Sequence, residues 1–392
     1  MRRWFHAGVA GLLLAAGPLA ACGGESDAAS GDGGDITIGI AAALTGPLAN
    51  DSIQKSIEYA IKQVNDKGGV LGGRKLKAEV VDIGATAATA QAAARKFTQA
   101  DVPFVVGYSI TQQNLAASPV FLKAKTISMI GTASTANNLD KTKNPYTFSF
   151  NIPDDETAEH QVQYALQDLR AEKVALLLDS TAFGKGYGDL VTPLLQQGGA
   201  QIVETQYINA TDNDVSAQVT KILAGKPDVL MVALLNAQTG KLMYSEIAKQ
   251  TSTPPKVIGA AALTGAFGST IPWDMAQGTY VTIMTESVWD PTVRTPEQKA
   301  WYEAVTGAVK PADNTAEMHD AVLAVASAID STKSTDPDDV SDYLKALKGF
   351  TGFNGIKTLV GSYECDAQHQ CLHQQYVGQV DGEQIKVVKK FE

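Results

Sequence analysis

The stretch that decides the fold begins with the apolar run Ile36-Thr37-Ile38-Gly39-Ile40, which is typical of a buried strand. Asn50-Asp51-Ser52 follows and can cap a helix, whose apolar face is predicted by residues at helical spacing: Ile53, Ile57, Ala60, Ile61 and Val64. Gly68-Gly69 can end this helix, and residues 76–80 alternate between apolar and charged side chains as a strand does. Strand, helix and strand in this order predict a parallel α/β sheet, which binds its ligands beyond the carboxyl ends of the strands.

The length and composition predict a soluble protein of two domains. The chain has 392 residues, of which 44% are hydrophobic and 19% are charged, a globular balance. Its formal net charge is -10 at pH 7. This charge argues against nucleic acid as a partner and against adhesion of the folded body to anionic lipid.

The N-terminus has the pattern of a processing segment. Arg2-Arg3 precedes an apolar run, residues 9–16, that is too short to span a bilayer as a helix. The sequence Leu19-Ala20-Ala21-Cys22 resembles the bacterial lipobox, which is cut before the cysteine that receives the lipid. We therefore expect residues 1–21 to be a lipoprotein signal peptide and Cys22 to carry the lipid; an ordinary secretory signal is the alternative.

Residues 22–35 are predicted to be a flexible tether, because they are rich in glycine, serine, alanine and acidic residues and lack apolar periodicity. We expect a cell-envelope protein, extracellular or periplasmic, held on the outer face of the cytoplasmic membrane. The lipid on Cys22 would be its only contact with the membrane.

Two cysteines remain once Cys22 is assigned to the lipid. In an exported protein, an even pair such as Cys365 and Cys371 predicts a disulfide. His369 and His373 lie close by, so a zinc cluster is the alternative. The spacing matches no common zinc module, so we expect the disulfide and no metal.

Strands and helices alternate along the rest of the chain. The first series ends near Asn151, where we place a crossing between domains, and a second series occupies residues 174–258. A further crossing is predicted at residues 280–284, and a terminal hairpin within residues 358–391. The sequence contains no Gly-x-Ser-x-Gly, no phosphate-binding glycine loop and no dinucleotide fingerprint. We therefore expect neither an enzyme nor a bound cofactor.

Four segments together resemble one family: Leu44-Thr45-Gly46-Pro47-Leu48-Ala49, residues 64–74, Phe104-Val105-Val106-Gly107 and residues 183–188. They resemble the type I periplasmic binding proteins of the branched-chain amino acid transporter class, with the last segment extending back to Asp179. The resemblance implies an α/β fold of two doubly wound parallel-sheet lobes joined by a three-strand hinge. It extends over nearly all of the chain from Asp35.

The resemblance also implies the domain boundaries and the partners. Lobe 1 would contain residues 36–151 and 284–360, and lobe 2 would contain residues 152–283 and 361–392. In this family the lobes close over a small organic solute, which is delivered to an ABC permease driven by an ATPase. We expect a monomer.

The family's site for the solute carboxylate resembles the loops at Thr111 and at residues 133–135. Thr111 is predicted to lie at a helix N-terminus, whose free N–H groups attract an anion. Ala133 and Thr135 would add main-chain groups and a hydroxyl, although these hydroxyls could merely cap helices. On the opposite lobe, Phe183 stands where a tyrosine is common, and Leu235 would extend an apolar wall.

Amino-acid-binding members pair the ligand's ammonium with an acidic side chain, and the matching position here is Ala261. Either Asp51, Asp179 or Glu286 replaces that acid, or the ligand is a small apolar or aromatic carboxylate or amide without an ammonium. An enclosed ammonium without a counter-charge is costly to desolvate. We therefore expect weak or no binding of leucine, isoleucine and valine.

Two other functions compete with solute import. A lipid-anchored sensor that presents its closed form to a signalling receptor would use the same fold. A cell-envelope enzyme is disfavoured, because the sequence lacks a catalytic set.

Overall fold

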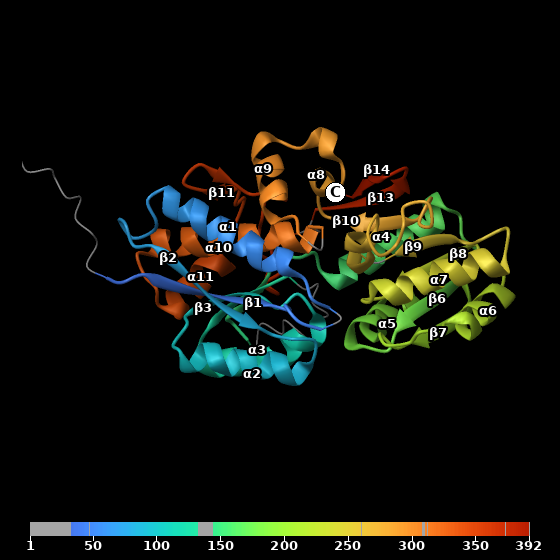
Figure 1. Cartoon of the computed structure of the whole chain (residues 1–392), viewed down its shortest axis with the longest axis horizontal. Helices are drawn as coiled ribbons and strands as arrows, with labels where there is room; N and C mark the ends of the chain where they lie inside the picture. The colour runs from blue at the N-terminus through green and yellow to red at the C-terminus, as the bar shows by residue number, and fades with distance from the viewer. Residues whose placement is uncertain are drawn as a thin grey trace, which may run out of the picture.

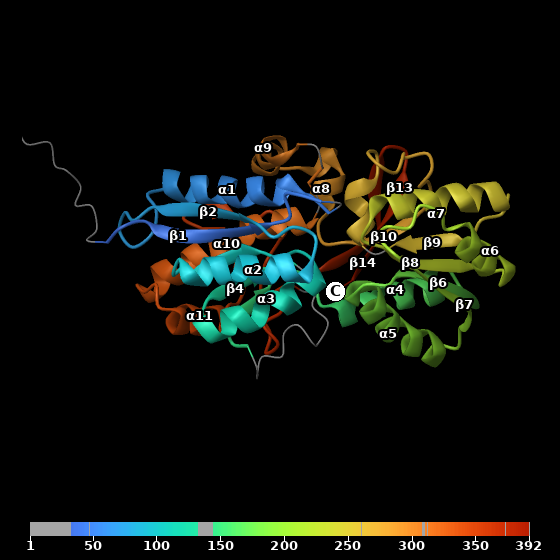
Figure 2. The same ribbon diagram turned by 60° about the horizontal axis from the view of Figure 1, so that its bottom comes forward.

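The computed structural model describes residues 33–46, 48–131, 144–259, 261–307, 310–311, 313–372 and 374–391. Two α/β lobes lie side by side in it (Figure 1). Each lobe has its own sheet, and helices cover both faces of each sheet (Figure 2). The predicted fold class is thus confirmed.

Lobe 1 is built on a five-stranded sheet in the order β2-β1-β3-β4-β5. All of its strand pairs are parallel. The strands are β1 (Ile36–Ala42), β2 (Leu76–Asp82), β3 (Phe104–Gly107), β4 (Ile127–Ile130) and β5 (Thr147–Ser149). β1 pairs with β2 on one side and with β3 on the other, so the strand order reverses at β1. Open α/β sheets bind their ligands at such a reversal.

Helices of lobe 1 pack on both faces of this sheet. One core lies beneath α1 (Asp51–Asp66), α9 (Pro296–Val305), α10 (Asp313–Thr332) and α11 (Pro337–Lys345). The other lies beneath α2 (Ala87–Gln99) and α3 (Thr111–Ala124). A short ladder, β11 (Gly352–Phe353) with β12 (Ile356–Lys357), packs beside α10.

Local sequence explains the opening of the chain as predicted. Asn50 caps α1, because its side-chain oxygen accepts a hydrogen bond from the Ser52 N–H at 3.0 Å. Gly68 and Gly69 follow the helix with φ of 104° and 79°, a region that favours glycine. Gly107 ends β3 with φ 134°, and a Cβ there would lie 2.0 Å from the Ala41 carbonyl oxygen. The strand ends of lobe 1 therefore require glycine for close backbone approach.

Lobe 2 is built on a seven-stranded sheet in the order β14-β13-β10-β9-β8-β6-β7. The parallel strands are β6 (Lys173–Asp179), β7 (Gln201–Ile208), β8 (Val229–Ala233), β9 (Lys256–Gly259) and β10 (Tyr280–Ile283). The predicted terminal hairpin is present as β13 (Gln375–Asp381) and β14 (Gln384–Phe391), antiparallel to each other and to β10.

The lobe 2 helices also divide between two faces. Against one face pack α4 (Asp154–Gln163), the π-helical turn η1 (Tyr164–Asp168) and α5 (Ala182–Gln197). Against the other pack α6 (Ser216–Ala224), α7 (Ala237–Gln250) and the 3₁₀ turn η2 (Ala261–Ala266). The short helices α8 (Glu286–Trp289) and η3 (Pro291–Val293) lead from β10 back to lobe 1.

The chain passes between the lobes three times: after β5, after β10 and before β13. The expected start of the last lobe 2 segment at residue 361 is wrong, because Tyr363, Cys371 and Leu372 are buried in the core of lobe 1. The Cys371 N–H donates to the Ser149 carbonyl at 2.8 Å, which holds this segment against β5. The return to lobe 2 therefore lies just before Gln375.

The expected disulfide joins Cys365 to Cys371. His369 lies in the enclosed loop, where its ring stacks on Phe148 with centroids 4.7 Å apart. No group of three or more metal-ligating side chains occurs in the described ranges, and His373 lies outside them. Across those same ranges, none of the helices is long and apolar enough to cross a membrane.

Candidate functional site

The loops that follow β1 and β2 form one edge of lobe 1, and Asp82 holds them together. Its carboxylate accepts hydrogen bonds from the Leu44 N–H at 2.9 Å, the Thr45 hydroxyl at 2.6 Å and the Gly84 N–H at 2.8 Å. Partial burial pushes the pKa of Asp82 up, but these donors outweigh it and leave the pKa below its ordinary value. The side-chain amide of Gln113 donates to the Gly84 carbonyl at 2.7 Å, which joins α3 to the same edge.

Thr111 begins α3 as predicted and is only 5% exposed. The residue before it, Ile110, has no side chain that could cap the helix, so the first turn keeps its uncapped N–H groups at the positive end of the helix dipole. One turn further, both polar atoms of the Asn114 side chain are buried, with no hydrogen-bond partner in the described part of the chain. This end of α3 is suited to an anionic group.

The predicted carboxylate site also includes Ala133 and Thr135. Ala133 and Thr135 lie outside the described residues, as does the predicted lipidation site Cys22. Gly131, the last described residue before them, accepts a hydrogen bond on its carbonyl from the Asn151 side chain at 3.2 Å. Asn151 belongs to the first crossover, so Gly131 lies beside the hinge.

Asp179, at the end of β6, is committed to the backbone of lobe 2. Its Oδ1 accepts from the N–H groups of Thr181 at 3.0 Å and Gly184 at 3.3 Å, and its Oδ2 accepts from the Leu235 N–H at 3.0 Å. The residue is 2% exposed. Main-chain donors thus already engage both oxygens of Asp179, which makes it a weaker candidate than Glu286 for the ammonium-pairing acid.

Phe183 lies in the first turn of α5 and is half-buried. Its N–H donates to the Thr181 hydroxyl at 3.2 Å, and its ring packs at the margin of the lobe 2 core. Helices α3 and α5 approach each other between the lobes (Figure 2). Leu235, half-buried at the end of β8, lies on the same strand-end edge of lobe 2 as Asp179.

Asp51, the first residue of α1, is paired within its own helix. Its Oδ2 lies 2.6 Å from the Lys55 ammonium. Gly307 packs over this pair, and a Cβ there would lie 2.3 Å from the Lys55 nitrogen. Its other oxygen, Oδ1 of Asp51, is buried without a hydrogen-bond partner in the described part of the chain.

Glu286 begins α8, directly after the second crossover, and is half-buried. No hydrogen bond or ion pair of its carboxylate is found within the described part of the chain. Burial and the negative charge of Glu286 together raise the pKa of the Tyr376 phenol. Ala261 begins η2, and its side chain is outside the described structure. Of the three acids considered from the sequence, Glu286 is the one that remains unpaired.

Asp154 is an acid that the sequence analysis did not single out. It begins α4, immediately after the first crossover, and Asp155 follows it. Burial and the charge of Asp155 raise the pKa of Asp154 to about 7. The available signal was two consecutive acids at a helix start beside a predicted crossing. A carboxyl in this state is largely protonated below neutral pH and is a poor partner for a cation.

Comparison with protein families places this geometry in context. A family model described as "Periplasmic binding protein" matches residues 35–384. The Leu/Ile/Val-binding protein BraC3 of Rhizobium johnstonii is 29% identical over 283 residues, covering 71% of this chain and 74% of the relative. The leucine-specific-binding protein of Salmonella typhimurium is 25% identical over 262 residues, covering 66% and 69%.

Solved structures share the same two-lobed fold. The branched-chain amino acid transporter substrate-binding protein LivJ from Streptococcus pneumoniae, in complex with isoleucine, has a TM-score of 0.78 at 21% identity, covering 91% of this chain and 99% of the other. An ABC transporter solute-binding protein from Rhodopseudomonas palustris, in complex with 3,4-dihydroxybenzoic acid, has a TM-score of 0.77 at 20% identity, covering 91% and 97%.

Proposed function

Because this chain belongs to the periplasmic binding protein family, we propose that it captures a small organic carboxylate between its two lobes. Proteins of this family are extracytoplasmic, bind small solutes and work with ABC permeases; they are not enzymes. Solute capture for a permease and its ATPase is the corresponding role for this chain.

One observation carries the solute class: the uncapped N-terminus of α3 is free to receive an anion, whereas two of the three candidate acids are already paired. Thr111 would hold the solute carboxylate together with Ala133 and Thr135. Asp179 and Asp51 are engaged by main-chain N–H groups and by Lys55, respectively. A ligand ammonium would therefore depend mainly on Glu286, the acid whose two oxygens are both unpaired among the described residues.

The opposite wall of the proposed site is apolar. Phe183 and Leu235 would face the body of the solute from lobe 2. This wall suits an aliphatic or aromatic carboxylate, and the fold accommodates both kinds of solute, since the two solved neighbours hold isoleucine and 3,4-dihydroxybenzoic acid. We propose a carboxylate or amide that lacks an ammonium.

Calorimetry with matched ligands tests this proposal. Leucine, isoleucine and valine are compared with 4-methylpentanoate, 3-methylpentanoate and 3-methylbutanoate, which lack only the ammonium, and with benzoate. Binding of at least one ammonium-free acid, with the amino acids at least tenfold weaker, is the expected result. Submicromolar binding of leucine with much weaker binding of 4-methylpentanoate would contradict it. Glu286→Gln serves as the control, because loss of leucine binding in that variant would identify Glu286 as the missing acid.

We further propose that the protein is anchored by a lipid on Cys22, through the tether of residues 22–35. The lipobox-like sequence Leu19-Ala20-Ala21-Cys22 supports this proposal, and an extracytoplasmic family is consistent with it. A monomer is proposed as well, since one chain supplies both lobes.

A further inference from the structure

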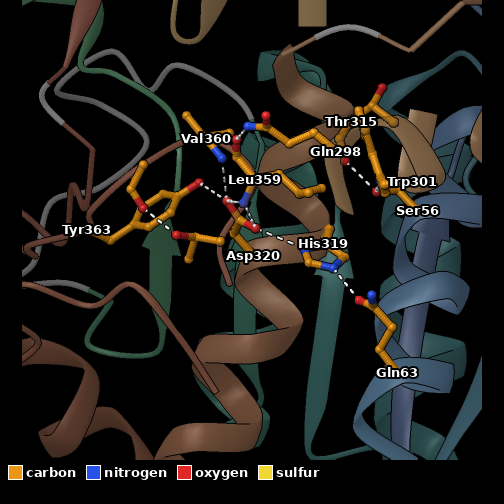
Figure 3. Close-up of polar contacts among 12 residues, drawn as sticks. Ser56, Gln63, Gln298, Trp301, Thr315, His319, Asp320, Leu359, Val360 and Tyr363 are labelled. Atoms are coloured by element: carbon orange, nitrogen blue, oxygen red, sulfur yellow. Dashed lines mark hydrogen bonds and ion pairs between the residues drawn. The ribbon is translucent and has the colours of Figure 1, made fainter. Parts of the chain in front are cut away.

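Asp320, in the middle of α10, is a completely buried carboxylate. It binds residues 359–363, which precede the third crossover. Its oxygens accept from the Leu359 N–H at 2.8 and 3.0 Å, from the Val360 N–H at 3.0 Å and from the Tyr363 hydroxyl at 2.8 Å (Figure 3). Nδ1 of His319 lies 2.8 Å from the same carboxylate. So many donors on one buried carboxylate fix this segment firmly onto α10.

Tyr363 extends this contact to the first crossover. Its ring stacks on Phe150 with centroids 4.5 Å apart, and Phe150 is the residue directly before the crossing at Asn151. Both rings are buried in the lobe 1 core. Tyr363 therefore joins Asp320, which its hydroxyl contacts, to Phe150, on which its ring stacks.

Two side-chain hydrogen bonds involve the second and third crossovers. The Gln298 side chain, on α9 after the second crossover, donates to the Leu359 carbonyl at 2.8 Å. The Gln374 side chain, at the third crossover, donates to the Met284 carbonyl at 3.4 Å. Asp320 thus reaches the first crossover through Tyr363 and the helix after the second crossover through Leu359 and Gln298. The third crossover is tied to the second by Gln374.

We propose that Asp320 is a positioning residue for lobe closure, which acts through Tyr363 to hold the lobe 1 ends of the crossovers as one rigid pivot. This rests on the proposed function, in which closure of the lobes captures the solute. Hinge motion confines the change in backbone angles to a few connecting residues, which requires fixed ends on both sides. Loosening the pivot would spread the open lobes over more orientations and weaken solute binding.

Trp301 provides a matched control in the same core. Its Nε1 donates to the Ser56 hydroxyl at 2.9 Å, and the side chain is 2% exposed. This hydrogen bond joins α9 to α1 and involves none of the crossover residues (Figure 3). Trp301→Phe and Tyr363→Phe each remove one buried hydrogen bond to a side chain and keep an aromatic ring, so both are expected to lower stability.

The test measures the distance between the lobes in protein without ligand, so its outcome does not depend on the identity of the solute. Spin labels are placed at the exposed positions Lys96→Cys on α2 and Lys221→Cys on α6, in the full chain with Cys22→Ala. Double electron–electron resonance is then recorded for wild type, Tyr363→Phe and Trp301→Phe. Tyr363→Phe is expected to broaden the distance distribution about twofold, whereas Trp301→Phe leaves it unchanged.

Equal broadening in the two variants, or an unchanged distribution in Tyr363→Phe despite its lower stability, would overturn the proposal. Asp320→Asn should broaden the distribution further, provided that it folds. Affinity for the tightest carboxylate of the calorimetry panel should fall about tenfold in Tyr363→Phe and remain within twofold in Trp301→Phe. If no carboxylate binds, the proposed solute class fails while the distance measurement still decides the role of Asp320.

Discussion

The carboxylate of Asp179 accepts a hydrogen bond from the main-chain N–H of Leu235 at 3.0 Å, which ties the end of β6 to the end of β8. Both residues were expected near the solute, but the structure gives them different parts. The Asp179 carboxylate accepts main-chain hydrogen bonds that fix the edge of lobe 2, and one of these bonds holds Leu235 in place. The polar groups that would recognise the solute are therefore expected mainly in lobe 1 and at the crossovers.

Thr111→Val and Thr135→Val are expected to weaken binding of the solute carboxylate. Each removes a hydroxyl that would donate to the anion, a loss of about 1–3 kcal/mol, or roughly tenfold to a hundredfold in affinity. Calorimetry with the tightest ligand of the carboxylate panel measures the effect. Thr126→Val is the control, because Thr126 is buried at the opposite end of the lobe 1 sheet, where β4 begins. Wild-type affinity in both site variants would place the site in other loops.

Asp154 is expected to make the folded protein less stable as the pH rises from about 4 to about 7. Its pKa is raised to about 7 from an ordinary value of 3.8, so the folded chain holds the proton more tightly than the unfolded chain. Folding therefore takes up a proton in this window, and the stability that protonation provides is lost as the pH passes through 7. Below pH 4 both states are protonated and the effect vanishes.

Asp154→Asn removes this titration and should be about 1–3 kcal/mol more stable than wild type at pH 8, with a smaller difference at pH 4. Urea unfolding at the two pH values measures it. Asp155→Asn removes only the neighbouring charge and should show a smaller gain. An equal difference at both pH values would show that the Asp154 carboxyl does not titrate in this range.

Much of the fold could be predicted because it depends on local pattern. The helix that Asn50 caps, the glycines that follow it and the alternation of strands with helices are all properties of neighbouring residues. Residues 361–372 were assigned to the wrong lobe because their position depends on distant partners, such as Tyr363 on Phe150. The hydrogen bonds of Asp179 also could not be predicted, since one of its donors lies 56 residues away. The periodicity of a sequence does not show contacts between residues that are far apart along the chain.

Replacing Cys365 and Cys371 together with serine should lower the free energy of unfolding by about 2 kcal/mol, the loop-entropy value for so short a loop. The loss of stability should be confined to the loop and the strand next to it. Hydrogen exchange at residues 147–149 is expected to accelerate, because the Ser149 N–H donates to the His369 carbonyl within the enclosed loop. Unchanged exchange at β5 would mean that the loop holds its position without the bond.

Cys22→Ala is expected to move the protein from the membrane fraction to the soluble fraction, because it removes the attachment point of the proposed lipid. Fractionation with immunoblotting measures this. Ala21→Ser, which leaves the cysteine in place, is the control and should remain with the membrane. Membrane attachment that persists in Cys22→Ala would refute the lipobox interpretation.

The loop closed by Cys365 and Cys371 runs along β5, the outer strand of the lobe 1 sheet, and exchanges main-chain hydrogen bonds with Ser149 on both sides. An uncovered strand edge is a template for pairing with another chain, and proteins that fold safely protect such edges. In this protein the protection is completed by an oxidation. Before that oxidation, the hydrogen bonds with Ser149 hold the loop on the edge of β5 without the covalent link.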